Sequence, residues 1–460
     1  MSKKDKQELR QQIACEWLYE NYLQFGHLRH DVVTDRLQIK AYPQPLPEGR
    51  GVKPTPTPSL KGGELSLQTK SFPLGEDLGE AMYWRNLTDK DINTMVCQCV
   101  AESGVNISTT EMWTAIKSDM VPAVHPLREW LNNLPLYTPD QPDWIDMLAQ
   151  KVKVKTSGEE TKGDKARGEE LWRACFKKWF VAMVASWMHD DVVNHTVLVL
   201  VGRQGIYKTT WLDRLIPPEL SAYSSKLPLS GQISKDDRLR LCENGMLNID
   251  ELDAICGREM NIVKSLLTST DVNERAAYGR LKERRVRLAS FCASTNNREF
   301  LTDVTGNRRW LPFEVESIQN PFNDIILYER VYSQAKALVE QGYFSYWFDM
   351  DEIAQLEQHN EDFRTQDSEE QLLPILFDVP AEGKGEFVTT AEISERLVTF
   401  GGIKKPMAIG RLGVLLGQKG YRSVTRGSKQ SRIRGWIVYQ RDTQEITANK
   451  KLLAKEGVTV

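Results

Sequence analysis

The stretch TVLVLVGRQGIYKTT, residues 196–210, is the strongest indication of the fold in the sequence. An apolar run ends at Gly202, a glycine-bearing loop follows, and Lys208 and Thr209 open a new amphipathic segment. A strand, a tight loop and a helix start in this order are typical of a phosphate-binding loop, because backbone N–H groups and the helix N-terminus favour an anion there. We therefore predict a nucleotide site in which Lys208 reaches the β- and γ-phosphates and the Thr209 hydroxyl binds Mg²⁺.

The loop departs at one position from the pattern G-x-x-x-x-G-K-[ST]. Tyr207 stands where the second glycine is expected, and Gly205 lies two residues earlier. A tyrosine there must adopt a backbone conformation that glycine normally takes, or the loop must shift. An ordinary strand–turn–helix is the alternative interpretation. The residues predicted to contact a nucleotide are Gly202, Gly205, Tyr207, Lys208, Thr209 and Thr210.

A second strand-like segment, residues 246–249, ends in Asp250 and Glu251. ATP hydrolysis needs one carboxylate that holds Mg²⁺ and a second that orients the attacking water. Asp250, together with Thr209, is predicted to serve the metal, and Glu251 to serve the water. A strand followed by an acidic helix cap is the alternative.

A third strand-like segment, residues 287–293, leads to Asn296, an amide that can position the water or sense the γ-phosphate. Further on, Arg308 and Arg309 precede the strand-like residues 311–315. Either arginine is a candidate finger for the nucleotide of a neighbouring subunit, and a surface salt bridge is the alternative for each. Four such signals in this order predict a nucleotide-hydrolysing core.

With these residues in place, the segment 196–315 resembles the virulence-associated E family, phage- and plasmid-borne relatives of superfamily 3 helicases. The stretch around GNRR is the most specific part of the resemblance, and the phosphate loop is the least. The resemblance is carried by GRQGIYKTT, NIDELD at 248–253, Lys264, Glu274-Arg275, Tyr278-Gly279-Arg280, the STNNREFL run from Ser294 and the TGNRRWLPFEV run from Thr305.

The resemblance implies an AAA+-like α/β P-loop ATPase that uses ATP and Mg²⁺, assembles as a homo-oligomeric ring such as a hexamer, and moves along DNA. It assigns the acidic pair to Asp250 and Glu251, the sensor to Asn296, and the finger to Arg308 or Arg309. Lys208 and Thr209 become the residues of the phosphate loop.

Composition indicates a globular protein of two to four domains, because the chain has 460 residues, 40% of them hydrophobic. The start MSKKDKQELR lacks the apolar stretch of a secretory signal, and the apolar run near residue 180 is shorter than the ~20 residues of a membrane span. Seven scattered cysteines include Cys97 and Cys99 without a second pair, which argues against zinc. We expect a cytoplasmic protein with no membrane partner.

The chain divides into seven expected parts. Only about forty residues precede the linker, so no primase region is expected there, and a separate primase is a candidate partner. The parts are an N-terminal helix and hairpin (1–42), a flexible Pro/Gly/Ser-rich linker (43–72), a helical domain (73–170), the ATPase domain with a buried helix at 171–189 (171–345), a solvated acidic connector (346–370), a winged-helix domain (371–441) and a tail (442–460).

Two basic regions predict contacts with DNA. The first is a hairpin before the third strand, where Lys282, Arg284 and Arg285 would grip single-stranded DNA in the ring's channel. A solvated hairpin is the alternative, and Arg275 and Arg280 could instead serve the nucleotide.

The second region is the winged helix, with three helices and a two-stranded wing. Residues 404–441 hold ten basic residues and no Asp or Glu, so an unbroken basic surface is expected to bind duplex or junction DNA. Protein contacts are the alternative for this domain. The predicted DNA contacts are Lys404, Lys405, Arg411, Arg426, Lys429, Arg432 and Arg434.

The residues together with the family resemblance imply an ATP-dependent DNA helicase or translocase of a phage or mobile element. The alternative, slightly favoured by Tyr207, is a nucleotide-gated DNA-binding or assembly module in element regulation or anti-phage defence.

Overall fold

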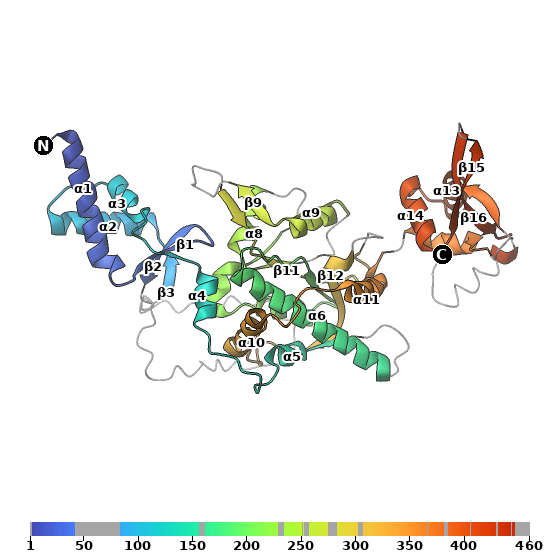
Figure 1. The fold of residues 1–460 in the computed structure, drawn as a ribbon, viewed down its shortest axis with the longest axis horizontal. Helices are drawn as coiled ribbons and strands as arrows, with labels where there is room; N and C mark the ends of the chain where they lie inside the picture. Colours follow the sequence, from blue (N-terminus) through green and yellow to red (C-terminus); the bar gives the residue numbers. More distant parts are fainter. Residues whose placement is uncertain are drawn as a thin grey trace, which may run out of the picture.

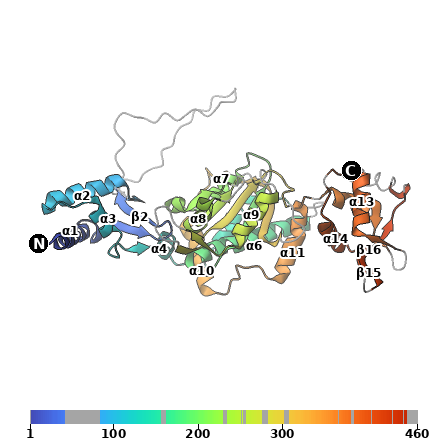
Figure 2. The ribbon, with the colours of Figure 1, turned by 90° about the horizontal axis from the view of Figure 1, so that it is seen from above.

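The computed structural model describes most of the chain as a mixed α/β protein. In Figures 1 and 2 the N-terminal helices and the C-terminal elements lie at opposite ends of the molecule, with a sheet between them. The described residues are 2–41, 83–155, 162–228, 234–250, 252, 257–274, 283–301, 307–365, 367–380, 385–404, 406–428, 431–442 and 444–446. The expected linker at 43–72 lies outside them.

A six-stranded sheet forms the centre of the molecule. Neighbouring strands are parallel except for β5, which pairs antiparallel with β12. The strands, in spatial order, are β5 (Val152–Val154), β12 (Trp310–Ile318), β6 (Val197–Val201), β11 (Ser290–Thr295), β8 (Met246–Ile249) and β7 (Ser224–Lys226). Every residue of β6, β8 and β11 is buried, as expected for parallel strands that are covered on both faces of the sheet.

Helices cover both faces of this sheet. Leu198 and Leu200 of β6 join one hydrophobic core, and the alternating Val197, Val199 and Val201 join the other. The predicted buried helix is confirmed as the end of α6 (Lys162–Met188), which packs on the leucine side with α10 (Tyr328–Gln341). The opposite core includes side chains of α8 (Lys235–Glu243) and α9 (Gly257–Thr268), and Figure 1 shows these helices across the sheet from α6.

The predicted third strand begins three residues later than expected. The backbone of residues 287–289 bonds outside the sheet. The N–H of Arg287 donates to Thr270 O, and those of Leu288 and Ala289 donate to Leu241 O. The Arg287 side chain is fully buried, and its guanidinium donates to backbone carbonyls of Asn194, Leu266, Leu267, Ser269 and Ala289. This arginine therefore connects the end of α9 to the residues before β6 through hydrogen bonds, and it is not part of an exposed basic surface.

The N-terminal hairpin is present as predicted, with β1 (Leu28–Asp31) antiparallel to β2 (Arg36–Ala41). It is extended to four strands by β3 (Tyr83–Asn86) and β4 (Ala123–Val124). Three helices, α1 (Lys3–Leu18), α2 (Asp89–Ser103) and α3 (Thr109–Ile116), share one core with this sheet. This grouping differs from the expected boundary, because residues on both sides of 43–72 contribute to the same core.

The rest of the expected helical domain packs elsewhere. Apolar side chains of α4 (Pro126–Asn132), α5 (Trp144–Ala149) and β5 belong to the core beneath the central sheet. The residue just before β7 also contacts the N-terminal sheet, since Tyr223 Oη donates to Oδ2 of the buried Asp31 in β1 at 2.8 Å.

His125 caps α4, and its burial gives a testable pH dependence. Its Nδ1 accepts a hydrogen bond from the N–H of Arg128 at 3.3 Å. Burial, followed by the charge of Arg128, lowers the pKa of His125 from 6.5 to about 4. Between these two values the unfolded chain binds a proton that the folded chain does not, so the free energy of unfolding should fall as the pH drops through this window.

His125→Asn keeps an acceptor at the cap but does not titrate. We expect this variant to lose less stability than the wild type between pH 7.5 and pH 5, measured by urea denaturation at both pH values. An equal loss in the two proteins would contradict the assignment of the pH dependence to His125.

The expected acidic connector contains a helix that is exposed on one side and packed on the other. Its helix α11 (Met350–Asn360) buries Leu356 and Asn360, and Asn360 Nδ2 donates to Asn307 O at 2.8 Å and Trp310 O at 3.0 Å. The acidic side chains of this helix coexist with a buried side because a helix presents different residues to solvent and to the core.

The C-terminal part contains three helices and a β-hairpin around its own core. The hairpin strand β16 also pairs with β13 and β14, so the sheet is larger than the predicted two strands. Its elements are α12 (Ser368–Leu376), β13 (Phe377–Asp378), β14 (Glu386–Thr389), α13 (Thr390–Gly401), α14 (Ile409–Gln418), β15 (Arg422–Ser428) and β16 (Ser431–Gln440). Leu397, Leu412, Leu416 and Trp436 are among its core residues. In the described part of the chain, no helix combines the length and apolar character needed to cross a membrane.

Candidate functional site

The carboxyl ends of three adjacent strands bring the predicted catalytic residues together. Strand β11 lies between β6 and β8, with Thr295 opposite Val201 and Ala293 opposite Ile249. Since all three strands run in the same direction, the residues that follow them emerge at one edge of the sheet. The glycine loop (residues 202–207), Asp250 and Asn296 therefore share that edge.

The glycine loop uses backbone conformations that its sequence only partly anticipates. Gly202 has φ +154°, which favours glycine, and a Cβ there would make a tight contact of 3.1 Å with Val315 O. Tyr207 is left-handed, with φ 68° and ψ 18°, just before the six-residue helix α7 (Lys208–Asp213). Of the two predicted possibilities, the tyrosine thus takes the glycine-like backbone, at a cost of roughly 1–2 kcal/mol.

Lys208 folds back over the glycine loop. The residue is 7% exposed, and its Nζ donates to Gly202 O at 2.6 Å, to Arg203 O at 2.9 Å and to Asn296 Oδ1 at 3.0 Å. The predicted phosphate lysine and the predicted sensor amide therefore meet directly. The ammonium group lies where the loop and the third strand converge, so it can serve a ligand held against the loop.

A hydroxyl and a carboxylate lie together beside this lysine. Thr209 Oγ1 is 3.1 Å from Asp250 Oδ1 and 2.9 Å from Ser294 Oγ, and Ser294 Oγ lies 3.3 Å from the same carboxylate oxygen. Hard oxygen donors of this kind suit Mg²⁺. Across the described residues, no three His, Cys, Asp or Glu side chains converge on a metal position. The pair would thus supply two ligands, with the rest from phosphates and water, as Mg²⁺ commonly accepts.

Lys226 is a charged neighbour that the sequence did not reveal. It ends the short edge strand β7, and its Nζ lies 2.6 Å from Asp250 Oδ2. Burial by itself raises the pKa of Asp250, but the hydrogen bond and charge of Lys226, with hydrogen bonds from Thr209 and Ser294, outweigh it and lower that pKa. A three-residue strand of the sequence SSK gives no pattern from which this contact could be predicted. Ser294 was within a predicted polar run, but its contact with Asp250 was not anticipated.

Glu251, the predicted water-orienting carboxylate, lies outside the described residues. Thr210 is part of α7, and Gly205 has φ +85° within the loop.

Arg308 and Arg309 lie at the opposite edge of the sheet from the glycine loop. They precede β12, whose first residue, Trp310, is opposite Val197 at the start of β6. The five residues of β6 separate the two edges by about 16 Å at ~3.3 Å per residue. Within one subunit these arginines are therefore far from Lys208. Burial lowers the pKa of Lys264, and the nearby charge of Arg309 lowers it further.

The first basic region forms a hairpin, but its arginines differ in environment. Strands β9 (Asp271–Glu274) and β10 (Glu283–Val286) pair antiparallel. The Arg284 side chain pairs with Asp271 but is 77% exposed, so it is accessible to DNA. Arg285 is only 12% exposed, because adjacent strand residues point to opposite faces. It pairs with Glu243 at 3.3 Å and donates to Val33 O, so its prediction as a DNA contact is wrong. Lys282 lies outside the described residues.

The expected unbroken basic surface of the C-terminal part is also wrong. Three of its cations pair with acidic residues that come earlier in the chain: Arg411 with Asp367, Lys419 with Glu370 and Arg441 with Asp378. The predicted contact Arg411 is therefore partly neutralised. The remaining described candidates are exposed: Lys404, and Arg426, Arg432 and Arg434 on the β15–β16 hairpin. Lys405 and Lys429 lie outside the described residues.

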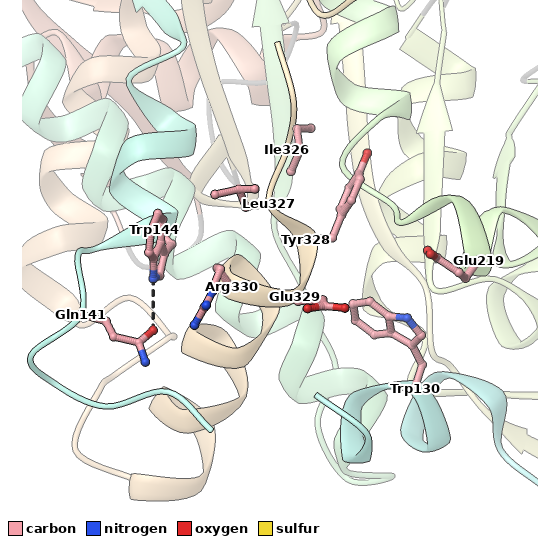
Figure 3. A pocket seen from close by; sticks show the side chains of 9 residues that line it. All are labelled: Trp130, Gln141, Trp144, Glu219, Ile326, Leu327, Tyr328, Glu329 and Arg330. Carbon is pink, nitrogen blue, oxygen red and sulfur yellow. Dashed lines mark hydrogen bonds between the residues drawn. The ribbon is translucent and has the colours of Figure 1, made fainter. Parts of the chain in front are cut away.

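A cavity of about 730 Å³ lies beneath the central sheet, and Figure 3 shows the side chains that line it. Among the described residues of the predicted catalytic site, none lines the cavity. Its walls are Trp130, Gln141, Trp144, Glu219 and residues 326–330. The Tyr328 hydroxyl donates to Arg214 O, at the end of α7, at 2.7 Å.

The sheet and the residues at its edge define a mixed α/β domain with a polar site at the carboxyl ends of parallel strands. Residues 161–365 match the family model of the virulence-associated protein E-like domain. The matched segment includes α6 and every strand from β6 to β12.

Comparisons over the whole chain give weaker likenesses. No curated protein sequence matches significantly. An apo structure of the NrS-1 C-terminal region (305–718) is 11% identical, with a TM-score of 0.41 over 92% of this chain and 99% of that chain. Two A-form apo structures of the same region give TM-scores of 0.39 and 0.36 at the same identity and coverage. Superpositions this loose say nothing about binding sites.

Proposed function

We propose that residues 161–365 form an AAA+-like P-loop ATPase core, and that the protein is an ATP-dependent DNA helicase or translocase of a phage or mobile element. The observation that carries this proposal is the convergence of Lys208 with Asn296, and of Thr209 with Asp250, from three adjacent parallel strands. An ordinary strand–turn–helix would not require these four side chains to meet.

The chain's own residues would divide the work of hydrolysis. Lys208 Nζ would exchange its carbonyl partners for phosphate oxygens, while Asn296 positions the water or senses the γ-phosphate. Thr209 and Asp250 would hold Mg²⁺, which supplies positive charge against the phosphates when bound. Glu251 would accept the proton of the attacking water.

The placement of Arg308 and Arg309 favours a ring with head-to-tail contacts. Because they lie at the sheet edge opposite Lys208, they can serve a nucleotide only in another subunit. Repeated head-to-tail contacts generate closed rings when the rotation closes. In such a ring each nucleotide would be held by the loop of one subunit and completed by an arginine of the next.

The C-terminal part would act as a winged helix that binds DNA. Its β15–β16 hairpin carries Arg426, Arg432 and Arg434 as exposed cations. Exposed arginines on a projecting hairpin can contact backbone phosphates of duplex or junction DNA. Arg284 is the described residue of the β9–β10 hairpin best placed to contact single-stranded DNA in the channel.

The proposal is tested by measuring ATP hydrolysis with and without single-stranded DNA, followed by strand displacement on a forked duplex. A DNA-stimulated ATPase that displaces the strand is the expected result. A protein that binds DNA but has no ATPase activity under any of these conditions would contradict a motor function.

The second candidate is a nucleotide-gated DNA-binding or assembly module, and the strained backbone of Tyr207 favours it. In that case nucleotide binding would change DNA affinity without turnover. ATP hydrolysis that is absent in the wild type and appears in Tyr207→Gly would support this module, because it would identify the tyrosine as a block on the loop.

Lys226→Met is expected to lower, by several-fold, the Mg²⁺ concentration that half-saturates ATP binding. The reason is that Lys226 Nζ occupies Asp250 Oδ2, and a bound metal must compete with it. The measurement is a titration of Mg²⁺ at fixed ATP, followed by fluorescence of a labelled nucleotide.

Lys153→Met is the matched control, since it removes an exposed lysine from β5 at the far side of the sheet. A raised Mg²⁺ requirement in Lys226→Met would show that the lysine assists the nucleotide complex instead of competing with the metal.

A further inference from the structure

Tyr207 and Phe322 form an aromatic pair beside the glycine loop. Their ring centroids are 6.3 Å apart and their planes are nearly perpendicular, at 78°. Phe322 is 70% exposed and Tyr207 is 38% exposed, so together they present apolar ring surface to solvent. Such surface next to a polar site is typical of a position that a ligand covers.

Phe322 is held in place although it is exposed. Its N–H donates to Asn320 Oδ1 at 3.0 Å, and the N–H of Asn323 donates to Asn320 O at 3.1 Å. The guanidinium carbon of Arg214 lies 5.9 Å from the Phe322 ring centroid. Tyr207 and Arg214 flank α7 at its two ends, so Phe322 contacts the residues on either side of the helix that begins with Lys208.

The backbone of Tyr207 is a second, independent observation. The residue directly before Lys208 has a positive φ, which costs a tyrosine more than it costs a glycine. Strained residues of this kind concentrate at ligand-binding positions, where the side chain or the conformation is used. Here the strained position carries a ring that glycine would not provide, and that ring contacts Phe322.

We propose that Tyr207 and Phe322 form the binding surface for the base of the nucleotide, with purine nucleoside triphosphates as the ligand class. This inference rests on the proposed function, because it requires the phosphates to lie at Lys208. Aromatic side chains bind bases through stacking, which uses the face of the base and not its hydrogen-bonding edge. The surface should therefore favour the larger purines over pyrimidines while separating ATP from GTP only weakly.

The test compares two ligands that share phosphates but not a base. Calorimetric titrations with the Mg²⁺ complexes of ATP and of inorganic tripolyphosphate are made on the wild type and on Phe322→Ala. We expect Phe322→Ala to bind ATP about tenfold more weakly and to bind tripolyphosphate with unchanged affinity. Ile325→Ala removes another exposed apolar side chain from the same loop and should change neither affinity. Thermal unfolding of each variant verifies that the fold is intact.

The outcomes separate this inference from the proposed function. If the wild type binds neither ligand, the proposed nucleotide site fails, and the base surface fails with it. If the wild type binds both, an ATP-selective loss in Phe322→Ala supports the base surface. Unchanged ATP affinity, or an equal loss for both ligands, overturns the base surface alone.

Discussion

Lys208→Ala is expected to abolish detectable ATP binding and to reduce DNA-stimulated ATP hydrolysis by at least ~10²–10³-fold, the usual effect of removing one preorganised donor from a charged transition state. The ammonium group is nearly buried and lies between two loop carbonyls and Asn296. An alanine leaves the phosphates without their closest positive charge. The measurements are steady-state ATP hydrolysis with and without single-stranded DNA, and ATP binding by calorimetry.

Two controls make this result interpretable. The loss of Lys208 also leaves Gly202 O and Arg203 O without a donor, so the melting temperature must be compared with that of the wild type. Lys153→Ala removes a lysine of the same charge from an exposed position on β5 and should retain full turnover. Wild-type turnover in Lys208→Ala would disprove the nucleotide site, and with it the ATPase.

The centre of the site could be predicted from sequence because it depends on strand order and direction alone. Three apolar runs, each ending in polar residues, indicate neighbouring parallel strands whose carboxyl ends meet at one edge. The sequence assigned Lys208, Thr209, Asp250 and Asn296 to one site, and in the structure Lys208 contacts Asn296 and Thr209 contacts Asp250. The same reasoning identified Tyr207 as the position of conflict, and its positive φ resolves that conflict in favour of the glycine-like backbone.

The parts that could not be predicted depend on contacts between distant segments. In the sequence Arg285 is one cation of a basic run. In the structure it donates to Val33 O, 252 residues away, and pairs with Glu243. Arg411 lies in a stretch without acidic residues but pairs with Asp367 from another helix's N-terminus. Local charge composition says how many cations a segment has, and only the tertiary fold says which of them are already paired.

The contact of Lys226 with Asp250 has the same origin. Strand β7 lies next to β8 only because the sheet adds it as an edge strand. Its three residues carry no periodicity that would mark a strand. A cation that balances a predicted metal ligand was therefore invisible in the sequence, although the ligand itself was not.

Replacement of the finger arginine is expected to reduce ATP turnover by ~10³–10⁵-fold while leaving ATP binding intact, because such a residue acts on the developing charge of the transition state. Arg308→Ala and Arg309→Ala are tested separately by steady-state hydrolysis and calorimetric ATP binding. Arg308 is exposed, whereas Arg309 is half-buried near Lys264. Exposure favours Arg308 as the residue that reaches a neighbouring subunit.

Subunit mixing distinguishes a finger that acts between subunits from one that acts within its own. A Lys208→Ala subunit has no working loop but keeps both arginines, and an Arg308→Ala subunit keeps its loop but lacks the finger. In a mixed ring, some interfaces place the intact loop of an Arg308→Ala subunit against the intact arginine of a Lys208→Ala subunit. Two inactive proteins should therefore regain part of the ATP turnover when they are combined. A finger that acts between subunits requires this recovery, because the two ends of β6, about 16 Å apart, separate the arginines from the loop of their own subunit. Mixtures as inactive as their components would refute an inter-subunit finger at Arg308.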